Sequence, residues 1–219
     1  MRARFTLADI QQHALVIVDR DGLAGLTMRS LAASLKTGAM TLYNYVDSRE
    51  ALEELVVDAV SSRVQIPEPT DDWRADTRAV ATAMWRTFRA HPAVIPLILT
   101  RRTSSRASLA PAEALAAALA RGGLDGVDLF VAFRAVSAFV TGIAQNELAG
   151  ALSREKDPAS AANRVEALAR GALPTLAELA PVGAVFSGQE FERGLTLILN
   201  GITHTPRPFS PHDQAEHGG

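Results

Sequence analysis

Apolar side chains recur along most of the chain at the three- and four-residue spacing that one face of a helix requires. Between Met28 and Leu35, for example, they fall at positions 0, 3, 4 and 7 of a helical pattern. No stretch alternates strictly between apolar and polar residues, which is the pattern of a half-buried strand. The sequence therefore predicts an all-α protein.

Capping and turn residues divide the first part of the chain into four predicted helices. Thr6 and Thr27 can each cap a helix, and Gly22 can end the first one in the left-handed conformation. Asp47 can cap the fourth helix, with Glu50 placed to complete a capping box. The four predicted helices cover residues 6–22, 27–35, 39–45 and 48–64.

A proline-rich break at residues 67–70 separates these helices from a second group. Pro174 interrupts a later helical pattern and predicts a kink or an end there. Polar stretches predict loops at 101–108 and 153–162. The second group of predicted helices covers residues 72–90, 93–100, 110–120, 125–152, 163–179 and 188–202.

Composition excludes several kinds of chemistry. The 219 residues contain no cysteine, which removes disulfides, thiolate metal sites and cysteine nucleophiles. The sequence also lacks paired histidines at metal-ligand spacing and a glycine-rich phosphate loop. We therefore expect no enzymatic activity, no cofactor and no bound metal.

The chain is expected to be cytoplasmic. Its first nine residues carry charge and no long apolar run, so no signal peptide is visible. The most apolar stretch, residues 127–149, is interrupted by polar side chains, so we expect no membrane span. These interruptions are Asp128, Arg134, Gln145, Asn146 and Glu147.

The order of elements between Leu26 and Leu55 carries the functional prediction. A capped helix, a break of three residues, a very short helix and a longer capped helix follow one another. Two helices joined by so short a turn form a helix-turn-helix, whose second helix lies in the DNA major groove. Leu31, Leu35 and Leu42 would pack the two helices together. Net charge is −2, so the prediction rests on this geometry and not on a basic surface.

The residues of this segment resemble the TetR family of bacterial regulators. A second segment, residues 191–202, is similar to the last helix of the tetracycline-repressor type of C-terminal domain, and the loop at 99–102 is faintly similar to that subclass. The matching runs near the N-terminus are Gly25-Leu26-Thr27-Met28-Arg29-Ser30-Leu31-Ala32, Thr41-Leu42-Tyr43-Asn44-Tyr45-Val46 and Ser48-Arg49-Glu50-Ala51-Leu52.

The resemblance implies a role for each position of the predicted DNA-binding surface. Arg29 would enter the major groove, where its guanidinium could make a bidentate hydrogen bond to guanine. The residues implied to hold phosphates are Thr27, Tyr43, Tyr45 and Arg49, and those left facing outward or nearest the bases are Thr37, Gly38, Ala39, Met40, Thr41 and Asn44.

The chain departs from the family pattern in the turn. Lys36 stands where the family usually has glycine, and Thr37 stands where it has a small apolar residue. We expect Gly38 to supply the backbone freedom that the turn needs.

The second half of the chain is expected to dimerise and to bind a ligand. In the family, the helices matching residues 125–152 and 188–202 form a four-helix bundle across a twofold axis. Arg134, Gln145 and Asn146 are polar groups on a mostly apolar helix, and they could contact ligand or pair across the dimer interface. The predicted ligand-binding residues are Trp85, Phe88, Leu97, Phe130, Phe133 and Arg134.

The expected effector is a hydrophobic or weakly polar organic molecule. Tetracycline-repressor relatives use a pocket histidine to hold a drug-bound magnesium ion, and no histidine lies around Leu99. Tetracycline is therefore not the expected effector.

These observations predict an N-terminal three-helix helix-turn-helix domain and a C-terminal helical bundle. We assign residues 1–47 to DNA binding, 48–66 to a connecting helix, 67–203 to ligand binding and dimerisation, and 204–219 to a disordered tail. The predicted function is that of a repressor, released from a palindromic DNA operator by a small organic molecule. The alternative is a helical ligand-binding or protein-interaction module without specific DNA binding, and activation in place of repression also remains open.

Overall fold

The structure, a computed structural model, describes residues 5–100, 105–152, 158–185 and 189–202. Every regular element within these ranges is a helix, so the predicted all-α class is confirmed. The predicted tail at 204–219 lies outside the described residues.

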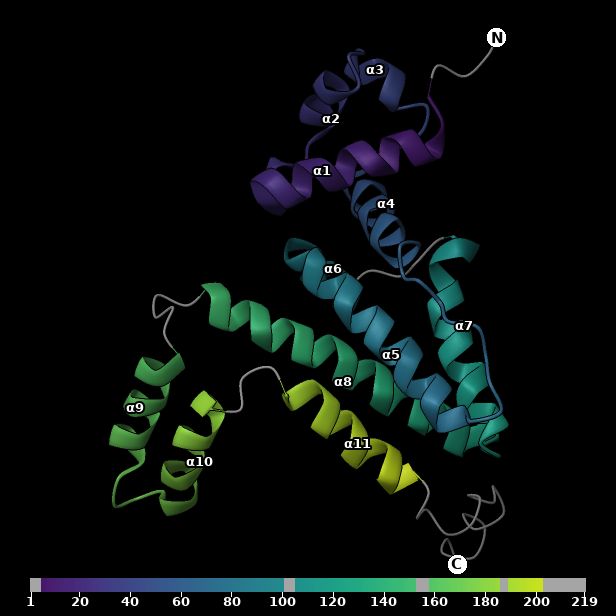
Figure 1. Ribbon diagram of the computed structural model, residues 1–219. Helices are drawn as coiled ribbons and strands as arrows, with labels where there is room; N and C mark the ends of the chain where they lie inside the picture. Colours follow the sequence, from purple (N-terminus) through teal and green to yellow (C-terminus); the bar gives the residue numbers. More distant parts are fainter. Residues whose placement is uncertain (1–4, 101–104, 153–157, 186–188, 203–219) are drawn as a thin grey trace, which may run out of the picture.

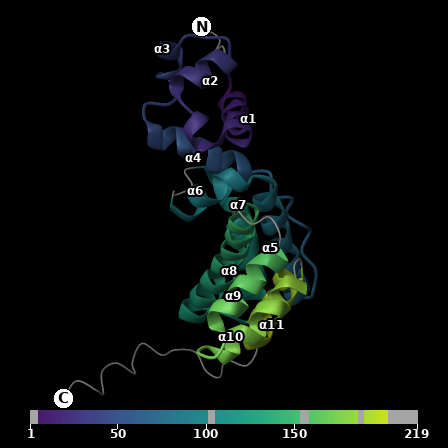
Figure 2. The ribbon, with the colours of Figure 1, turned by 90° about the vertical axis from the view of Figure 1, so that its left-hand side faces the viewer.

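Three helices form a small bundle at one end of the molecule, and a fourth leads from it into the body (Figure 1). Figure 2, turned by 90°, shows the same stacking of the bundle on one end of a longer body. Leu31, Leu35 and Leu42 are all buried in the core, as the sequence predicted. The four helices are α1 (Leu7–Gly25), α2 (Met28–Ser34), α3 (Ala39–Leu42) and α4 (Arg49–Ser61).

The body is built around α5, which packs against α7 and α8, while α11 lies on α8. Trp85 of α5 stacks on Phe191 of α11 with ring centroids 4.4 Å apart, and Phe139 of α8 lies against the same ring at 5.8 Å. The elements are α5 (Trp73–Ala90), the 3-10 helix η1 (Pro92–Val94), α6 (Ile95–Thr100), α7 (Arg106–Arg121), α8 (Gly126–Leu152), α9 (Pro158–Ala169), α10 (Pro174–Val185) and α11 (Glu190–Ile202).

Local signals set the ends of the first helix. The Thr6 hydroxyl accepts from the Asp9 amide at 3.1 Å, and the Asp9 carboxylate accepts from the Thr6 amide at 2.8 Å. Hydrogen bonds from the Thr6 hydroxyl and amide hold the pKa of Asp9 below its ordinary value. Gly22 has φ 71°, the left-handed conformation expected of it, but one further turn follows and α1 ends at Gly25.

Three helices of the body differ from their predicted bounds. The loop predicted over 101–108 is too long, because α7 begins at Arg106 and not at residue 110. The pattern over 163–179 predicted a single helix with a kink or an end at Pro174, and the structure has α9 and then α10, which begins at Pro174. The loop predicted over 153–162 is also too long, because α9 begins at Pro158; residues 153–157 lie outside the described part. Proline is favoured in the first turn of a helix, because its missing amide would have no partner there.

One helix stands out for its apolar length. Residues Gly126–Glu147 of α8 are long and apolar enough to cross a membrane, judged by length and composition alone. In the structure α8 packs against α5, α6, α7 and α11 on one side, and 28% of its apolar stretch is buried. Its other side is exposed, and Phe130 on that side is 62% exposed.

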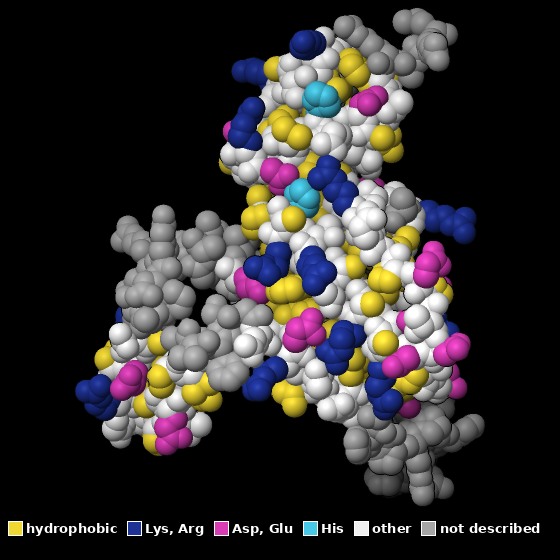
Figure 3. Space-filling model, in the orientation of Figure 1, with side chains coloured by type: hydrophobic (Ala, Val, Ile, Leu, Met, Phe, Trp, Pro, Cys, Tyr) yellow, Lys and Arg dark blue, Asp and Glu magenta, His cyan; other side chains and the backbone are white. Residues whose placement is uncertain are grey.

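The α9–α10 pair forms a hairpin that projects from the body (Figure 1). Its two helices pack chiefly on each other. Hydrophobic side chains are visible on its surface among charged ones (Figure 3). The exposed leucines of the hairpin are Leu168, Leu173, Leu176 and Leu179.

Candidate nucleic-acid interface and ligand region

Thr27 builds the start of the helix-turn-helix. Its hydroxyl accepts from the Ser30 amide at 3.0 Å, and the Ser30 hydroxyl accepts from the Thr27 amide at 2.9 Å. This reciprocal capping box satisfies two amides that would otherwise lack partners at the start of α2. The predicted cap is therefore confirmed, and Thr27 would have to contact phosphate while it also caps the helix.

The turn between α2 and α3 corrects one prediction. Gly38 was expected to supply the backbone freedom, but its φ is −82°, which any residue can adopt. Lys36 carries the left-handed conformation instead, with φ 53°. The strain therefore falls on the position where the family usually has glycine.

The surface formed by α3 and its flanks presents most of the predicted DNA-binding residues to solvent. Met40 is 80% exposed and Tyr43 50%. Arg29 is exposed and makes no hydrogen bond or ion pair within the described part of the chain. Gly38 and Asn44 are exposed too, while Thr37, Ala39, Thr41 and Tyr45 are half-buried.

Arg49 is held in place by three interactions while its side chain stays 42% exposed. Its Nη2 donates to the carbonyl of Leu23 at 2.8 Å, its Nη1 donates to the carbonyl of Leu26, and its Nε pairs with Glu53 at 2.8 Å. The guanidinium thus ties the end of α1 and the start of α2 to α4. A role in phosphate binding stays a prediction, and the structure adds this clamp, which the sequence did not reveal.

Helix α4 connects the bundle to the body. It packs against α1 on one side and against α5, α6 and α7 on the other. The cap of α4 is Ser48, whose hydroxyl accepts from the Ala51 amide at 3.1 Å. The predicted capping box from Asp47 to Glu50 is therefore wrong, because the chain enters the helix one residue later. The helix also ends at Ser61, three residues before the predicted position.

A hydrogen-bonded junction joins α1 to the body beside α4. His91, the C-cap residue of α5, has its Nδ1 2.9 Å from the carboxylate of Asp19 on α1. Arg63 lies just after α4, with Nη1 3.3 Å from Nε2 of His91, and its Nη2 donates to the side-chain oxygen of Gln12. Because arginine can only donate, Nε2 accepts and Nδ1 carries the proton that Asp19 accepts.

The six predicted ligand-binding residues do not share one environment. Trp85, Phe88 and Leu97 are buried in the core, and Phe133 is half-buried beside it. Phe130 and Arg134 lie on the exposed side of α8. None of the six lines the groove of about 790 Å³ that the structure has on another face of α5.

Polar atoms on α8 mark a second feature of the ligand region. The Ser137 hydroxyl and the Gln145 carbonyl oxygen are shielded from solvent and have no hydrogen-bond partner among the described residues. Eight residues separate them, so both lie within about 80° on one side of the helix. Buried polar atoms of this kind usually have a hydrogen-bond partner, either in the protein or in a bound molecule. Near them, burial raises the pKa of Glu147, against the opposing effect of Arg89, which pairs with it at 2.8 Å.

Within the described residues, no three histidine, cysteine, aspartate or glutamate side chains gather where they could hold a metal ion.

Comparison with known proteins identifies the family. The family model described as "Tetracyclin repressor-like, C-terminal domain" matches residues 66–205. An HTH-type transcriptional regulator of Saccharopolyspora erythraea is 31% identical over 200 residues, which cover 90% of this chain and 84% of that protein. The HTH-type transcriptional repressor DrrR1 of Streptomyces coeruleorubidus is 29% identical over 207 residues, covering 90% and 77%.

A solved structure gives the same result. The Streptomyces coelicolor TetR family protein ActR, in complex with actinorhodin, superposes with a TM-score of 0.80 at 30% identity and covers 92% of this chain and 96% of that one. A family match over more than half of the chain and a relative aligned over nine-tenths of it together show that the chain belongs to the TetR family of HTH-type transcriptional regulators.

Proposed function

We propose that this protein is a dimeric repressor that binds a near-palindromic DNA operator and leaves it when a small organic molecule binds. The membership of the family supports a ligand-responsive, DNA-binding regulator. The observation that carries the proposal is the exposed surface at α3, where Arg29, Met40 and Tyr43 face solvent beside a buried leucine core. A regulator of this kind acts in the cytoplasm, where its DNA is, and carries out no catalysis.

The dimer is proposed to form through α8 and α11. Val127, Phe130 and Val131 expose apolar surface on one side of α8, and Leu197 of α11 is 73% exposed. Large exposed apolar patches mark interaction sites. To read two half-sites, the dimer needs its two α3 helices about one DNA turn apart, roughly 34–36 Å.

The effector is proposed to bind between α5, α6 and α8. Trp85, Phe88, Leu97 and Phe133 would line the site once these packed helices part, and the unpartnered oxygen atoms of Ser137 and Gln145 offer hydrogen bonds. Phe130 and Arg134 would contribute from the exposed side of α8, where a partner subunit would cover them. ActR, a similar protein, was crystallised in complex with actinorhodin. We propose a weakly polar organic effector that is not tetracycline.

Release would work through α4, which contacts the bundle and the body alike. The effector must prefer the state in which the two α3 helices no longer match the DNA. A preference of about 5.5 kcal/mol moves a two-state balance from 1:99 to 99:1. By linkage, operator DNA must weaken effector binding by the same factor.

The first experiment measures binding of the purified protein to the DNA that flanks its own gene. We expect one near-palindromic segment to bind specifically. Replacing Arg29 and Tyr43 by alanine should weaken that binding at least about tenfold, because each lost base or phosphate contact costs about 1–3 kcal/mol. The matched control is Arg170→Ala, which removes one exposed positive charge from the α9–α10 hairpin.

Two outcomes decide between the candidate functions. A dimer that loses operator binding only in the Arg29/Tyr43 variant supports the regulator. A folded dimer that binds no flanking DNA above nonspecific levels would favour the ligand-binding module, a reading consistent with an α3 that has no basic residue. Sedimentation of Leu197→Glu tests the dimer separately, because a charge on the proposed interface should produce monomers.

A further inference from the structure

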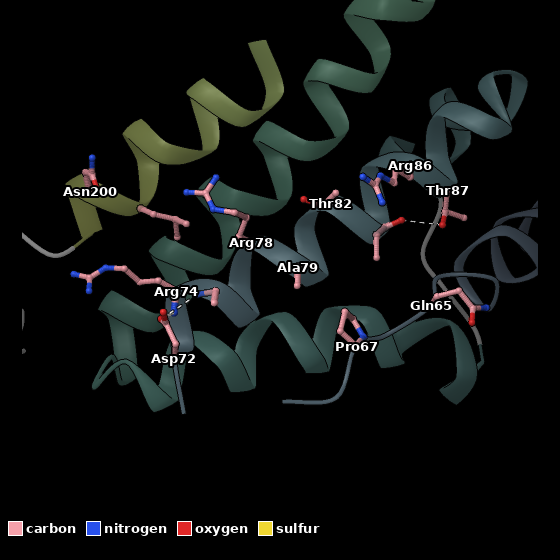
Figure 4. Close-up of a pocket in the computed structure, with 13 residues that line it drawn as sticks. Gln65, Pro67, Asp72, Arg74, Arg78, Ala79, Thr82, Arg86, Thr87 and Asn200 are labelled. Carbon is pink, nitrogen blue, oxygen red and sulfur yellow. Dashed lines mark hydrogen bonds between the residues drawn. The ribbon is translucent and has the colours of Figure 1, made fainter. Parts of the chain in front are cut away.

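A groove runs along α5 on a face that none of the proposed DNA, effector or dimer contacts uses. Its volume is about 790 Å³, which lies within the range of small-molecule sites. Figure 4 shows α5 running along it, with the end of α11 at Asn200 on one side and Pro67 of the α4–α5 connection on the other.

Small side chains on α5 create the hollow. Ala75, Ala79 and Ala83 repeat every four residues, so they lie on nearly the same side of the helix. Leu199 of α11 and Pro67 of the connection stand on either side of them without filling the space. The floor is therefore apolar and long enough to hold an extended ligand.

Arginines give this groove its charge. Arg74, Arg78 and Arg86 all line it, and they extend over twelve residues or about 18 Å of helix. The acidic residue in the lining, Asp72, accepts hydrogen bonds from the amides of Arg74 and Ala75 as the N-cap of α5.

The three arginines differ in how far they are already engaged. Arg78 pairs with Glu192 at 3.1 Å and donates to Thr196 at 3.0 Å, so it fastens α11 to α5. Arg74 lies over the Trp73 ring at 4.8 Å and makes no ion pair within the described residues. Arg86 has no hydrogen bond or ion pair within that same part of the chain. Two guanidinium groups at the groove therefore remain available to an anion.

We propose that this groove is a second ligand site, which binds an extended organic acid. A carboxylate, phosphate or sulfonate group would be held by Arg74 or Arg86, because guanidinium groups bind such oxygens in pairs. The apolar body of the ligand would lie on Ala79 and Ala83. Gln65 and Pro67 also line the groove, and both belong to the connection between α4 and α5. The occupant would therefore touch the segment that connects the two halves of the molecule.

The test uses two fluorescent probes with the same aromatic body. One is 8-anilinonaphthalene-1-sulfonate, which is anionic, and the other is N-phenyl-1-naphthylamine, which is neutral. Two variants alter the groove by independent means. Arg74→Gln with Arg86→Gln removes the charge, whereas Ala79→Leu fills the floor without changing charge. Arg20→Gln with Arg170→Gln is the charge-matched control, since both arginines are exposed and lie outside the groove.

The proposal predicts a defined pattern of affinities. The sulfonate should bind each groove variant at least about tenfold more weakly than the wild-type protein. The arginine variant loses a charge-assisted contact, and the leucine of Ala79→Leu occupies the space in which the aromatic body would lie. The control should keep wild-type affinity, and the arginine variant should bind the neutral probe unchanged. Sulfonate affinity within twofold of wild type in either groove variant would overturn the proposal.

Competition then defines the ligand class. Decanoate should displace the sulfonate from the wild-type protein, whereas inorganic phosphate at the same concentration should not, because phosphate cannot use the alanine floor. Equal displacement by phosphate would show that the floor contributes nothing and would refute an extended organic acid. Displacement by a glutamate decamer and not by decanoate would likewise overturn it, in favour of an acidic peptide.

Discussion

The backbone of Lys36 is left-handed in the turn that sets the angle between α2 and α3. For a residue with a side chain, this conformation is strained by a clash between Cβ and the following carbonyl oxygen. The side chain is exposed and has an interaction of its own, so the cost of the backbone is measured against a variant that lacks the same side chain.

Lys36→Gly should relieve that strain. We expect the free energy of unfolding to rise by about 0.5–1 kcal/mol, since glycine adopts positive φ freely but also gains entropy in the unfolded chain. The comparison is Lys36→Ala, which removes the same side chain and keeps the strain. Urea unfolding of both variants measures the difference, and equal stabilities would show that φ 53° carries no cost here.

Asp76 is the second residue considered at this scale, and its surroundings set the pKa of its carboxyl group. It accepts from the Thr70 amide at 2.9 Å, from the Thr70 hydroxyl at 2.8 Å and from Arg121. Burial alone would raise the pKa of Asp76, but these hydrogen bonds outweigh it and lower the pKa below its ordinary value. The carboxylate thereby fastens the α4–α5 connection to α7.

This lowered pKa predicts how stability depends on pH. The folded protein holds Asp76 ionised more strongly than the unfolded chain does, so the stabilisation is complete above the unfolded pKa and is lost as pH falls below about 4. Asp76→Asn should lower Tm at pH 7, and the gap between the two proteins should shrink as pH drops from 4 toward 3. A gap that stays constant over that interval would contradict the role of the charge.

The packing of α11 on α8 depends on the close contact between Gly194 of α11 and Phe139 of α8. A Cβ added at Gly194 would lie 2.5 Å from the ring of Phe139, whereas one added at Gly201 would meet nothing within 4 Å. Both glycines lie within the same helix, so they share its intrinsic cost of about 0.5–1 kcal/mol relative to alanine. The difference in stability between the alanine variants of the two glycines therefore measures the contact between α11 and α8.

Gly194→Ala should therefore destabilise the protein by about 1–3 kcal/mol, the usual cost of overpacking. Gly201→Ala should stabilise it by about 0.5–1 kcal/mol through helix propensity. Urea unfolding at fixed protein concentration measures both. Should Gly194→Ala prove as stable as Gly201→Ala, the close packing of Phe139 would be refuted.

At the scale of the whole molecule, the bundle and the body meet at one end, where histidine, acidic and basic side chains gather on the surface (Figure 3). The Asp19–His91–Arg63 junction lies between α1, the end of α4 and the end of α5. It offers a second connection beside α4. A change in the body can therefore reach α1 directly as well as through α4.

His91→Ala should loosen this connection. The loss of its hydrogen bonds should cost about 1–2 kcal/mol, and amide exchange should accelerate in the second half of α1 while α8 and α11 keep their protection. His13→Ala is the matched control, because His13 bonds Ser34 at 2.6 Å within the bundle alone. Unchanged exchange in α1 would show that the junction does not couple the two parts.

The sequence alone determined what depends on local chemistry. Helical spacing predicted the all-α class, Thr27 and Thr6 marked helix starts, and the leucines of the helix-turn-helix were assigned to its core, because each of these follows from interactions within a few residues. The resemblance of residues 25–52 also predicted the family. The cap of α4 predicted at Asp47 lies one residue later, at Ser48, because neighbouring polar side chains compete for the same backbone amides.

Only the tertiary structure decided which groups meet across long separations. The sequence did not show that Arg49 is held by the carbonyls of Leu23 and Leu26, or that His91 reaches Asp19 across 72 positions. It presented the arginines and alanines of α5 as an ordinary helix pattern, and only the placement of α11 and residue 67 turned that face into a groove. Such contacts depend on how whole helices pack, which local periodicity does not specify.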